Sequence, residues 1–280
     1  MTPNANRPTR SEQREAARAK AREIRDAHKK QEKVRKVGLI SGVIASVLVF
    51  GGLIGWLVVA NQPAPALTPV NAMFNDGIRV GTGIKTFTPE VTPNTADVPV
   101  VKIYMDYQCP ICQMFEVPNS ALIRNKVNSG EWIVEYHPIS FLDGRGSPNT
   151  YSSRAANAAM CVAEHSPNDF MTYTSLLYAN QPAEQTPGPE NDKLIAFANQ
   201  VGVQNESKIA DCVNNKSYGA WIQTATNKAL SEKVPGTDLS VQGTPFIVVG
   251  KQNYTWNTQA DLGSPARFEQ WVAAAWEASK

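Results

Sequence analysis

Cys109-Pro110-Ile111-Cys112 is the stretch that decides the fold, because it lies where a strand pattern gives way to a helical pattern. Residues 98–104 are rich in β-branched and other apolar side chains, as expected of a buried strand. After the stretch, apolar residues recur with helical spacing at Met114, Phe115 and Leu122. Pro110 suits the first position of a helix, where no N–H donor is needed. The sequence therefore predicts a junction between a strand and a helix, with two cysteines at the start of the helix.

The position of the two cysteines predicts different chemistry for each. Unpaired N–H groups at a helix start favour a thiolate, so we expect a lowered pKa and an exposed sulfur for Cys109. Cys112 lies one turn deeper and should be shielded. An exposed thiolate attacks a partner's sulfur to form a mixed disulfide, which the second thiol resolves. The spacing thus predicts dithiol-disulfide exchange, with Cys109 as nucleophile and Cys112 as resolving thiol.

Two other interpretations of the motif stay open at this point. A lone CxxC can be half of a zinc site, but structural zinc takes four ligands, and no second CxxC or paired histidines follow. A purely structural disulfide is the second alternative, although a bridge within one tight turn tends to be strained and reducible. We therefore favour a redox-active pair, and we expect neither a metal nor another cofactor.

Charge is distributed unevenly along the 280 residues. Residues 1–36 hold 12 of the 27 basic and 5 of the 25 acidic residues, so this tail has a net charge of +7 and the remainder a net charge of −5. The tail has no aromatic residue for stacking on bases between Ser11 and Lys36, which argues against nucleic-acid binding. A solvated juxtamembrane segment that touches anionic lipid is the favoured interpretation.

The segment 37–60 contains no charged residue and is long enough to cross the hydrocarbon core as a helix. Basic residues crowd its N-terminal side, at Lys33, Arg35 and Lys36, whereas no charge follows it until Asp76. The positive-inside rule then predicts a single-pass protein of the cell membrane with a cytoplasmic N-terminus and an extracytoplasmic body.

A cleaved signal peptide is the alternative to a membrane anchor. Ala64-Pro65-Ala66 resembles a cleavage site, but the apolar run is too long and the preceding tail too extended for that assignment. Residues 61–76 begin with a proline-rich run and are predicted to form a semi-rigid linker that holds the body off the membrane.

All four cysteines lie beyond the predicted membrane segment, in a compartment that permits disulfides. If Cys109 pairs with Cys112, then Cys161 and Cys212 remain for a second, structural bridge. Two buried free thiols are the alternative for this second pair.

Patterning of residues 77–280 predicts one α/β domain with a helical insertion at about 141–233. A first strand or a hairpin is expected at 78–87, and further strands at 131–137, 241–249 and 252–256. Further helices are expected at 150–165, 168–180, 190–201, 207–233 and 264–279. The helix after the motif should continue to about residue 128, with a bend at Pro118.

This order of elements resembles the thioredoxin fold with the helical insertion of DsbA-like thiol-disulfide oxidoreductases, over roughly residue 98 to the C-terminus. The stretches that carry the resemblance are Asp106-Tyr107-Gln108-Cys109-Pro110-Ile111-Cys112, the alanine-rich helix at 155–159, Phe170 with Leu176 and Leu177, and Gly243-Thr244-Pro245-Phe246. The resemblance implies a cis Pro245 beside the cysteines and a Thr244 main chain that pairs with the bound substrate.

Two positions near the motif differ from the family pattern. The strongest oxidants of the family have a histidine where this chain has Ile111, whose side chain cannot donate a hydrogen bond to a thiolate. Many relatives carry a buried acid where this chain has Ile103, so the proton of Cys112 must move through another group or water. Asp106 is either that substitute or simply a residue at the end of a strand.

Two further side chains are candidates on weaker grounds. Glu116 lies four residues after Cys112, on the same helical face, and matches an acidic position in relatives. A solvated surface carboxylate is the alternative for Glu116. His137, followed by Pro138, is interpreted as a structural residue at the end of a strand.

Together these features predict a membrane-anchored, extracytoplasmic oxidoreductase that introduces disulfides into exported proteins with reduced cysteines. The resemblance implies a quinone-linked membrane partner of the DsbB or VKOR type that reoxidises the cysteine pair. Reductase or isomerase activity is the alternative within the class, and a non-enzymatic anchored binding module is the alternative outside it.

Overall fold

The computed structural model describes residues 67–91 and 97–280, together with scattered residues between 15 and 52. The chain divides into two units, 1–64 and 65–280. The described residues of the first unit are helical. Within the described part of the chain, no helix combines the length and apolar character needed to cross a membrane. The predicted membrane span 37–60 lies outside the described residues except for Gly51 and Gly52.

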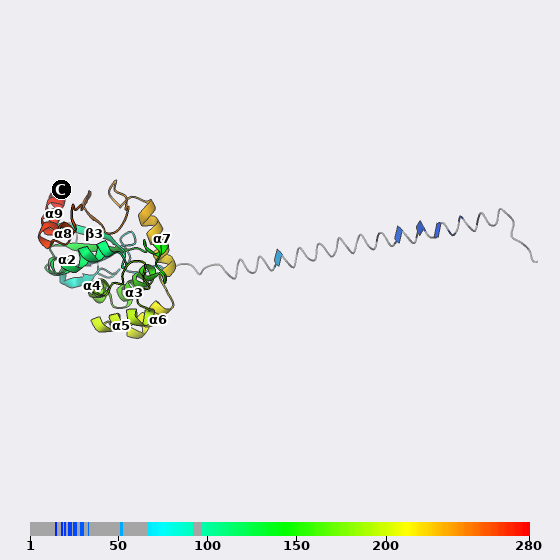
Figure 1. The fold of residues 1–280 in the computed structure, drawn as a ribbon, viewed down its shortest axis with the longest axis horizontal. Coiled ribbons are helices and arrows are strands. Elements are labelled where there is room, and N and C mark those ends of the chain that lie inside the picture. The colour runs from blue at the N-terminus through cyan, green and yellow to red at the C-terminus, as the bar shows by residue number, and fades with distance from the viewer. Residues whose placement is uncertain are drawn as a thin grey trace, which may run out of the picture. The chain divides into compact units, whose positions relative to one another are not determined.

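A mixed sheet forms the centre of the second unit (Figure 1). Among the described residues it has six strands in the order β2-β1-β4-β3-β5-β6. Their bounds are β1 (Ile78–Gly81), β2 (Lys85–Thr86), β3 (Val100–Met105), β4 (Ile133–Pro138), β5 (Phe246–Val249) and β6 (Gln252–Asn253). β3 and β4 are parallel and joined through a helix, whereas the other neighbouring pairs are antiparallel. The strand expected over 241–249 is confined to its last four residues, because the residues before them form a loop.

The alternation of side chains along β3 separates two apolar layers. Val101, Ile103 and Met105 belong to the main core, whereas Tyr104 belongs to a smaller cluster on the other face with Val248. Ile103, at the position where relatives carry an acid, is therefore a fully packed core residue with 1% of its surface exposed.

Helices cover the sheet and form the insertion. Their bounds are α2 (Pro110–Asn128), α3 (Tyr151–His165), α4 (Phe170–Ala179), α5 (Asn191–Val201), α6 (Glu206–Asn214), α7 (Gly219–Ser231), α8 (Gln259–Leu262) and α9 (Pro265–Glu277), with short 3-10 turns η1 (Thr82–Ile84), η2 (Asp143–Arg145) and η3 (Pro167–Asp169). α2 packs against α4 and α9, and α3 packs against α4, α6 and α7. Figure 1 shows α5 and α6 together, on the side of the domain opposite α8 and α9.

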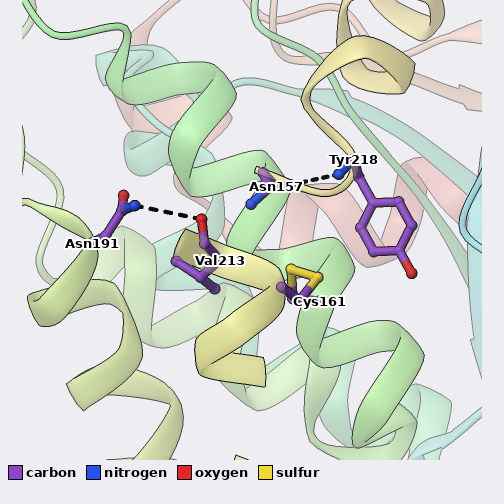
Figure 2. Close-up of a disulfide and its surroundings, with 6 residues drawn as sticks. Asn157, Cys161, Asn191, Val213 and Tyr218 are labelled. Atoms are coloured by element: carbon purple, nitrogen blue, oxygen red, sulfur yellow. Dashed lines mark hydrogen bonds between the residues drawn. A yellow bond between two sulfur atoms is a disulfide. The ribbon is translucent and has the colours of Figure 1, made fainter. Parts of the chain in front are cut away.

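The single helix expected over 207–233 is wrong, because the chain breaks between α6 and α7. Lys216 adopts a left-handed conformation with φ 50°, and the Tyr218 N–H donates to the Asn157 side chain on α3 at 2.8 Å (Figure 2). Asn214 and Asn215 are also poor helix formers. The break lets α6 and α7 pack separately on α3.

A disulfide joins Cys161 on α3 to Cys212 on α6, and both residues are buried (Figure 2). It links positions 51 residues apart in sequence. The Asn191 side chain donates to the Val213 carbonyl at 3.4 Å beside the bridge. The disulfide therefore links α3, the first helix of the insertion, to α6.

Residues 70–77, most of which we assigned to the linker, lie against the folded domain. Asn71 is 5% exposed and donates its side-chain N–H to the Ala163 carbonyl at 2.7 Å, and the Val70 N–H donates to Glu164 at 2.8 Å. Asp76 pairs with Lys228 on α7 at 2.8 Å. This segment is thus anchored on the insertion before β1 begins.

Candidate active site

The cysteine motif lies at the junction that the sequence predicts. β3 ends at Met105, and Cys109 is the N-cap of α2, with Pro110 at the first helical position. The buried residues of α2 recur every three or four positions, which fixes the face that the helix turns to the core. These residues are Cys112, Phe115, Glu116, Asn119, Ile123 and Val127. Cys112 therefore points into the core, one turn below Cys109.

The loop before β5 packs against the motif. The Thr244–Pro245 peptide bond is cis, and the Cys109 thiol donates to the Thr244 carbonyl, with 3.2 Å between Sγ and O. The two residues are 135 positions apart in sequence. Antiparallel pairing of β3 with β5, with Tyr104 opposite Phe246, brings them together at one end of the sheet.

Both cysteines of the motif are free thiols, and Cys109 is less exposed than we expected. Cys109 keeps 6% of its surface accessible and Cys112 keeps 2%. The expectation of an openly exposed Cys109 is wrong in the described structure, because the Thr244 carbonyl lies directly against its sulfur. Cys109 nevertheless remains the more accessible of the two.

The environments of the two thiols separate their acidities. The Cys112 thiol donates to the Cys109 sulfur and, as the largest influence, lowers the pKa of Cys109 to about 7 in spite of burial. The Thr244 side chain and the N–H groups of Cys112 and Ile111 contribute in the same direction. Burial, followed by the hydrogen bond to Cys109, raises the pKa of Cys112 well above its usual range. The helix start therefore supplies only part of the stabilisation that we assigned to it.

The Thr244 hydroxyl is a contributor that the sequence did not reveal. Its oxygen is buried and has no hydrogen-bond partner among the described residues of the dithiol form. The hydroxyl favours the charged form of either sulfur: it contributes to the lowered pKa of Cys109 and opposes part of the rise in the pKa of Cys112. Thr244 thus stands beside the redox pair with its side chain as well as its main chain.

Asp106 anchors the loop that precedes the motif. Its carboxylate accepts hydrogen bonds from the Ser152 hydroxyl at 2.5 Å, from the Gln108 N–H at 2.8 Å and from the Leu142 N–H at 2.9 Å. Burial raises its pKa to about 6, against the effect of these donors. Three donors from three segments identify Asp106 as an organising residue of the motif loop.

Glu116 is buried rather than solvated, with 3% of its surface exposed. Its carboxylate accepts a hydrogen bond from the Ser175 hydroxyl at 3.2 Å, and none of the ion pairs among the described residues includes it. Burial raises the pKa of Glu116 to about 7. The interpretation of Glu116 as a surface carboxylate is therefore wrong.

We expect this burial to make stability depend on pH through Glu116. Between its unfolded pKa near 4.5 and its folded pKa near 7, the folded protein binds more protons than the unfolded chain, so stability falls as pH rises through this window. The loss attributable to Glu116 amounts to about 3 kcal/mol above pH 7. Glu116→Gln should therefore be more stable than wild type at pH 8, with a much smaller difference at pH 4.5, in urea unfolding. A variant that is less stable than wild type at pH 8 would contradict the assignment.

His137 lies in a structural cluster and makes no hydrogen bond to either cysteine of the motif. It is 3% exposed, its Nε2 is 2.7 Å from Glu135 Oε1, and its ring stacks on Tyr104 with 4.2 Å between centroids. Glu135 also accepts from Arg79 at 2.6 Å. Burial opposes ionisation of Glu135, but the hydrogen bond to His137 and the charges around it give a net lowering of its pKa. The sequence pattern did not indicate this buried ion pair.

A groove of about 600 Å³ begins at the cis-proline loop. Thr244 and Pro245 form one part of its wall, and the aromatic residues Tyr254 and Trp256 form another. Its lining also contains one residue of each charge, Lys233 and Asp238. The groove offers a polypeptide both main-chain and aromatic contacts next to the redox pair.

Comparison with known proteins agrees with the site. A family model described as "Thioredoxin" matches residues 93–265. This match covers more than half of the chain, so the chain belongs to the thioredoxin family. No curated protein matches the chain.

Solved structures define the class more narrowly. The reduced disulfide bond oxidoreductase DsbG from Mycobacterium tuberculosis is 28% identical, with a TM-score of 0.56 over 73% of this chain and 89% of that chain. Oxidised DsbA from the same organism is also 28% identical, with a TM-score of 0.53 over 73% of this chain and 100% of that chain. MdbA from Actinomyces oris, a thiol-disulfide oxidoreductase, is 19% identical and shares the fold, with a TM-score of 0.52 over 76% and 100%. The predicted thioredoxin fold is confirmed, and the chain is a DsbA-like protein thiol-disulfide oxidoreductase.

Proposed function

We propose that this protein works as an oxidase, introducing disulfides into exported proteins with Cys109 as the nucleophilic sulfur and Cys112 as the resolving thiol. The observation that carries the proposal is the asymmetry of the pair, in which the pKa of Cys109 is lowered to about 7 and that of Cys112 is raised. A pair whose reduced form is stabilised as a thiolate is an oxidising disulfide.

The proposed reaction begins with the Cys109–Cys112 disulfide. A substrate thiolate attacks Cys109 Sγ, so that a mixed disulfide forms and Cys112 leaves as a thiolate that takes up a proton. A second substrate thiolate then attacks the substrate sulfur of the mixed disulfide, and Cys109 leaves as a stabilised thiolate. The substrate loses two electrons to form its disulfide, and the Cys109–Cys112 pair gains them. In this proposal, the groove beside Thr244 and Pro245 receives the substrate chain.

Turnover requires a two-electron acceptor that restores the disulfide. We propose a quinone-linked membrane partner of the DsbB or VKOR type in this role, on the strength of the resemblance to DsbA-like proteins. The composition of residues 37–60 suits a membrane-spanning helix. A chain anchored through this segment would lie in the same membrane as such a partner.

Location outside the cytoplasm is part of the same proposal. The basic flank at Lys33, Arg35 and Lys36 supports it through the positive-inside rule, and the Cys161–Cys212 disulfide suits an oxidising compartment. A reporter fused after Lys280 should be active only if it works outside the cytoplasm. Activity from a reporter that works only in the cytoplasm would overturn this topology.

Two assays on the domain from residue 67 onward separate the oxidase from its alternatives. In oxidative refolding of a reduced protein that needs disulfides, the oxidised domain should accelerate the recovery of activity. In insulin reduction, it should be the weaker catalyst. Strong insulin reduction with little oxidative refolding would favour a reductase, and neither activity would indicate a binding module.

Ile111 provides a further prediction about oxidising strength. Its N–H helps the Cys109 thiolate, but its side chain offers no donor. If Ile111→His lowers the pKa of Cys109 by about one unit, the thiolate gains about 1.4 kcal/mol and the potential rises by about 30 mV. Ile111→Leu, which also lacks a donor, is the matched control. A glutathione titration that found the histidine variant unchanged or more reducing would refute this role of the residue.

A further inference from the structure

The segment that leads into the redox motif is held by the loop between α4 and α5, within the helical insertion. The Gln181 side-chain amide donates to two main-chain carbonyls, Tyr107 O and Cys109 O, both at 3.0 Å. In the opposite direction, the Gln108 side chain donates to Ala183 O at 3.2 Å and to Thr186 O at 2.9 Å. Each glutamine therefore binds main-chain carbonyls in the segment that contains the other.

Gln181 differs from the other residues of this contact because it binds the nucleophilic cysteine itself. The end of α4 also holds neighbouring residues, since Tyr178 OH donates to Asp106 O at 3.0 Å and the Gln113 side chain donates to Tyr178 O at 2.8 Å. Among the described residues, Gln181 alone supplies a side-chain donor to the Cys109 carbonyl.

The Cys109 carbonyl is a sensitive point for the redox chemistry. It accepts the Gln113 N–H at 3.2 Å, which is the first hydrogen bond of α2. Its orientation fixes how Cys109 leaves the extended conformation, at φ −74° and ψ 116°, and enters the helix. That turn places Sγ near the N–H groups of Ile111 and Cys112, which favour the thiolate. The side-chain N–H of Gln181, which is the positive end of the amide dipole, also points at this carbonyl. The carbonyl belongs to the same residue as the sulfur on which the negative charge forms.

We propose that Gln181 is a positioning residue for the redox pair: its amide fixes the main chain of Cys109 from the helical insertion and thereby makes the Cys109–Cys112 disulfide more oxidising. The inference rests on the proposed function and deepens it, because it assigns the insertion a part in setting the redox equilibrium. Gln181 acts through the main chain and does not itself touch the reacting substrate sulfur.

A pair of matched variants tests the proposal. Gln181→Asn shortens the side chain by one methylene, so the amide no longer reaches both carbonyls. Gln185→Asn makes the same chemical change in the same loop, at an exposed residue whose side chain has no hydrogen-bond partner among the described residues and whose φ of 62° asparagine tolerates. In equilibrium with glutathione, Gln181→Asn should be less oxidising than wild type by about tenfold, or about 30 mV, with a raised pKa of Cys109, whereas Gln185→Asn should match wild type.

Gln181→Glu keeps the length of the side chain and reverses the polarity of the contact. An ionised carboxylate would face two carbonyl oxygens, so this variant should be more reducing than Gln181→Asn at pH 8. At pH 5 the protonated acid regains one donor, and the difference from wild type should shrink. A raised pKa of Cys109 at pH 8 would not follow from a purely structural role, and it remains measurable in Gln181→Glu if the asparagine variant fails to fold.

Wild-type redox equilibria in folded Gln181→Asn and Gln181→Glu, or an equal shift in Gln185→Asn, would overturn the proposal. Failure of the oxidase proposal itself would instead appear in wild type, as a potential no more oxidising than thioredoxin. The two outcomes are therefore distinguishable in one set of titrations.

Discussion

Alanine at Cys109 should reduce oxidative refolding to the uncatalysed rate, because no sulfur remains at the position that forms the mixed disulfide. Cys112→Ala should also lose turnover but should accumulate mixed disulfides through Cys109, since the resolving thiol is absent. Gel electrophoresis without reducing agent, followed by mass spectrometry, would identify these adducts.

The difference between the two variants is what tests the assignment of roles. Cys109 is both the more accessible residue and the one with the lowered pKa, so trapping should be confined to the variant that retains it. Equal trapping by both variants would reject the assignment. Trapping mainly through Cys112, in Cys109→Ala, would reverse the roles.

Removing the structural bridge should have the largest effect on stability. In the chain-entropy account, a disulfide between positions 51 residues apart stabilises the fold by about 4 kcal/mol. The double variant Cys161→Ala with Cys212→Ala should therefore melt roughly 10 °C below wild type. Its redox potential should be unchanged, because the bridge lies between α3 and α6 and neither of its cysteines belongs to the motif.

Peptide mapping provides the control for this experiment. The exported protein should yield a peptide pair linked through Cys161 and Cys212, and the pair should survive mild reduction that opens the Cys109–Cys112 disulfide. Free thiols at both positions would refute the bridge in the exported protein. An unchanged melting temperature in the double variant would refute its stabilising role.

The sequence allowed the fold and the centre of the site to be predicted because the decisive signals are local. The change from strand to helix at Cys109 and the Thr-Pro dipeptide before β5 are each encoded within a few residues. The resemblance to DsbA-like proteins then predicted that Pro245 lies near the cysteines. The pairing of β3 with β5 is the physical reason for their proximity.

The contacts that the sequence did not reveal join segments that are distant along the chain. The burial of Cys109 depends on Thr244. The side-chain hydrogen bond to the Cys109 carbonyl comes from Gln181, 72 residues away. Neither contact leaves a periodic pattern in the sequence. Glu116 could be placed on the Cys112 face of α2, but its burial depends on the packing of α2 against α4. The break between α6 and α7 likewise depends on a contact with α3.

The central claim, that the Cys109–Cys112 pair is poised as an oxidant, is tested most directly by its reduction potential. Equilibration of the wild-type domain with glutathione buffers, with the fraction reduced read by thiol alkylation, gives this value. The account predicts a potential between about −270 mV, typical of thioredoxin, and about −120 mV, typical of DsbA. A potential at or below about −270 mV would contradict it, because the pair would then favour reduction of its partners.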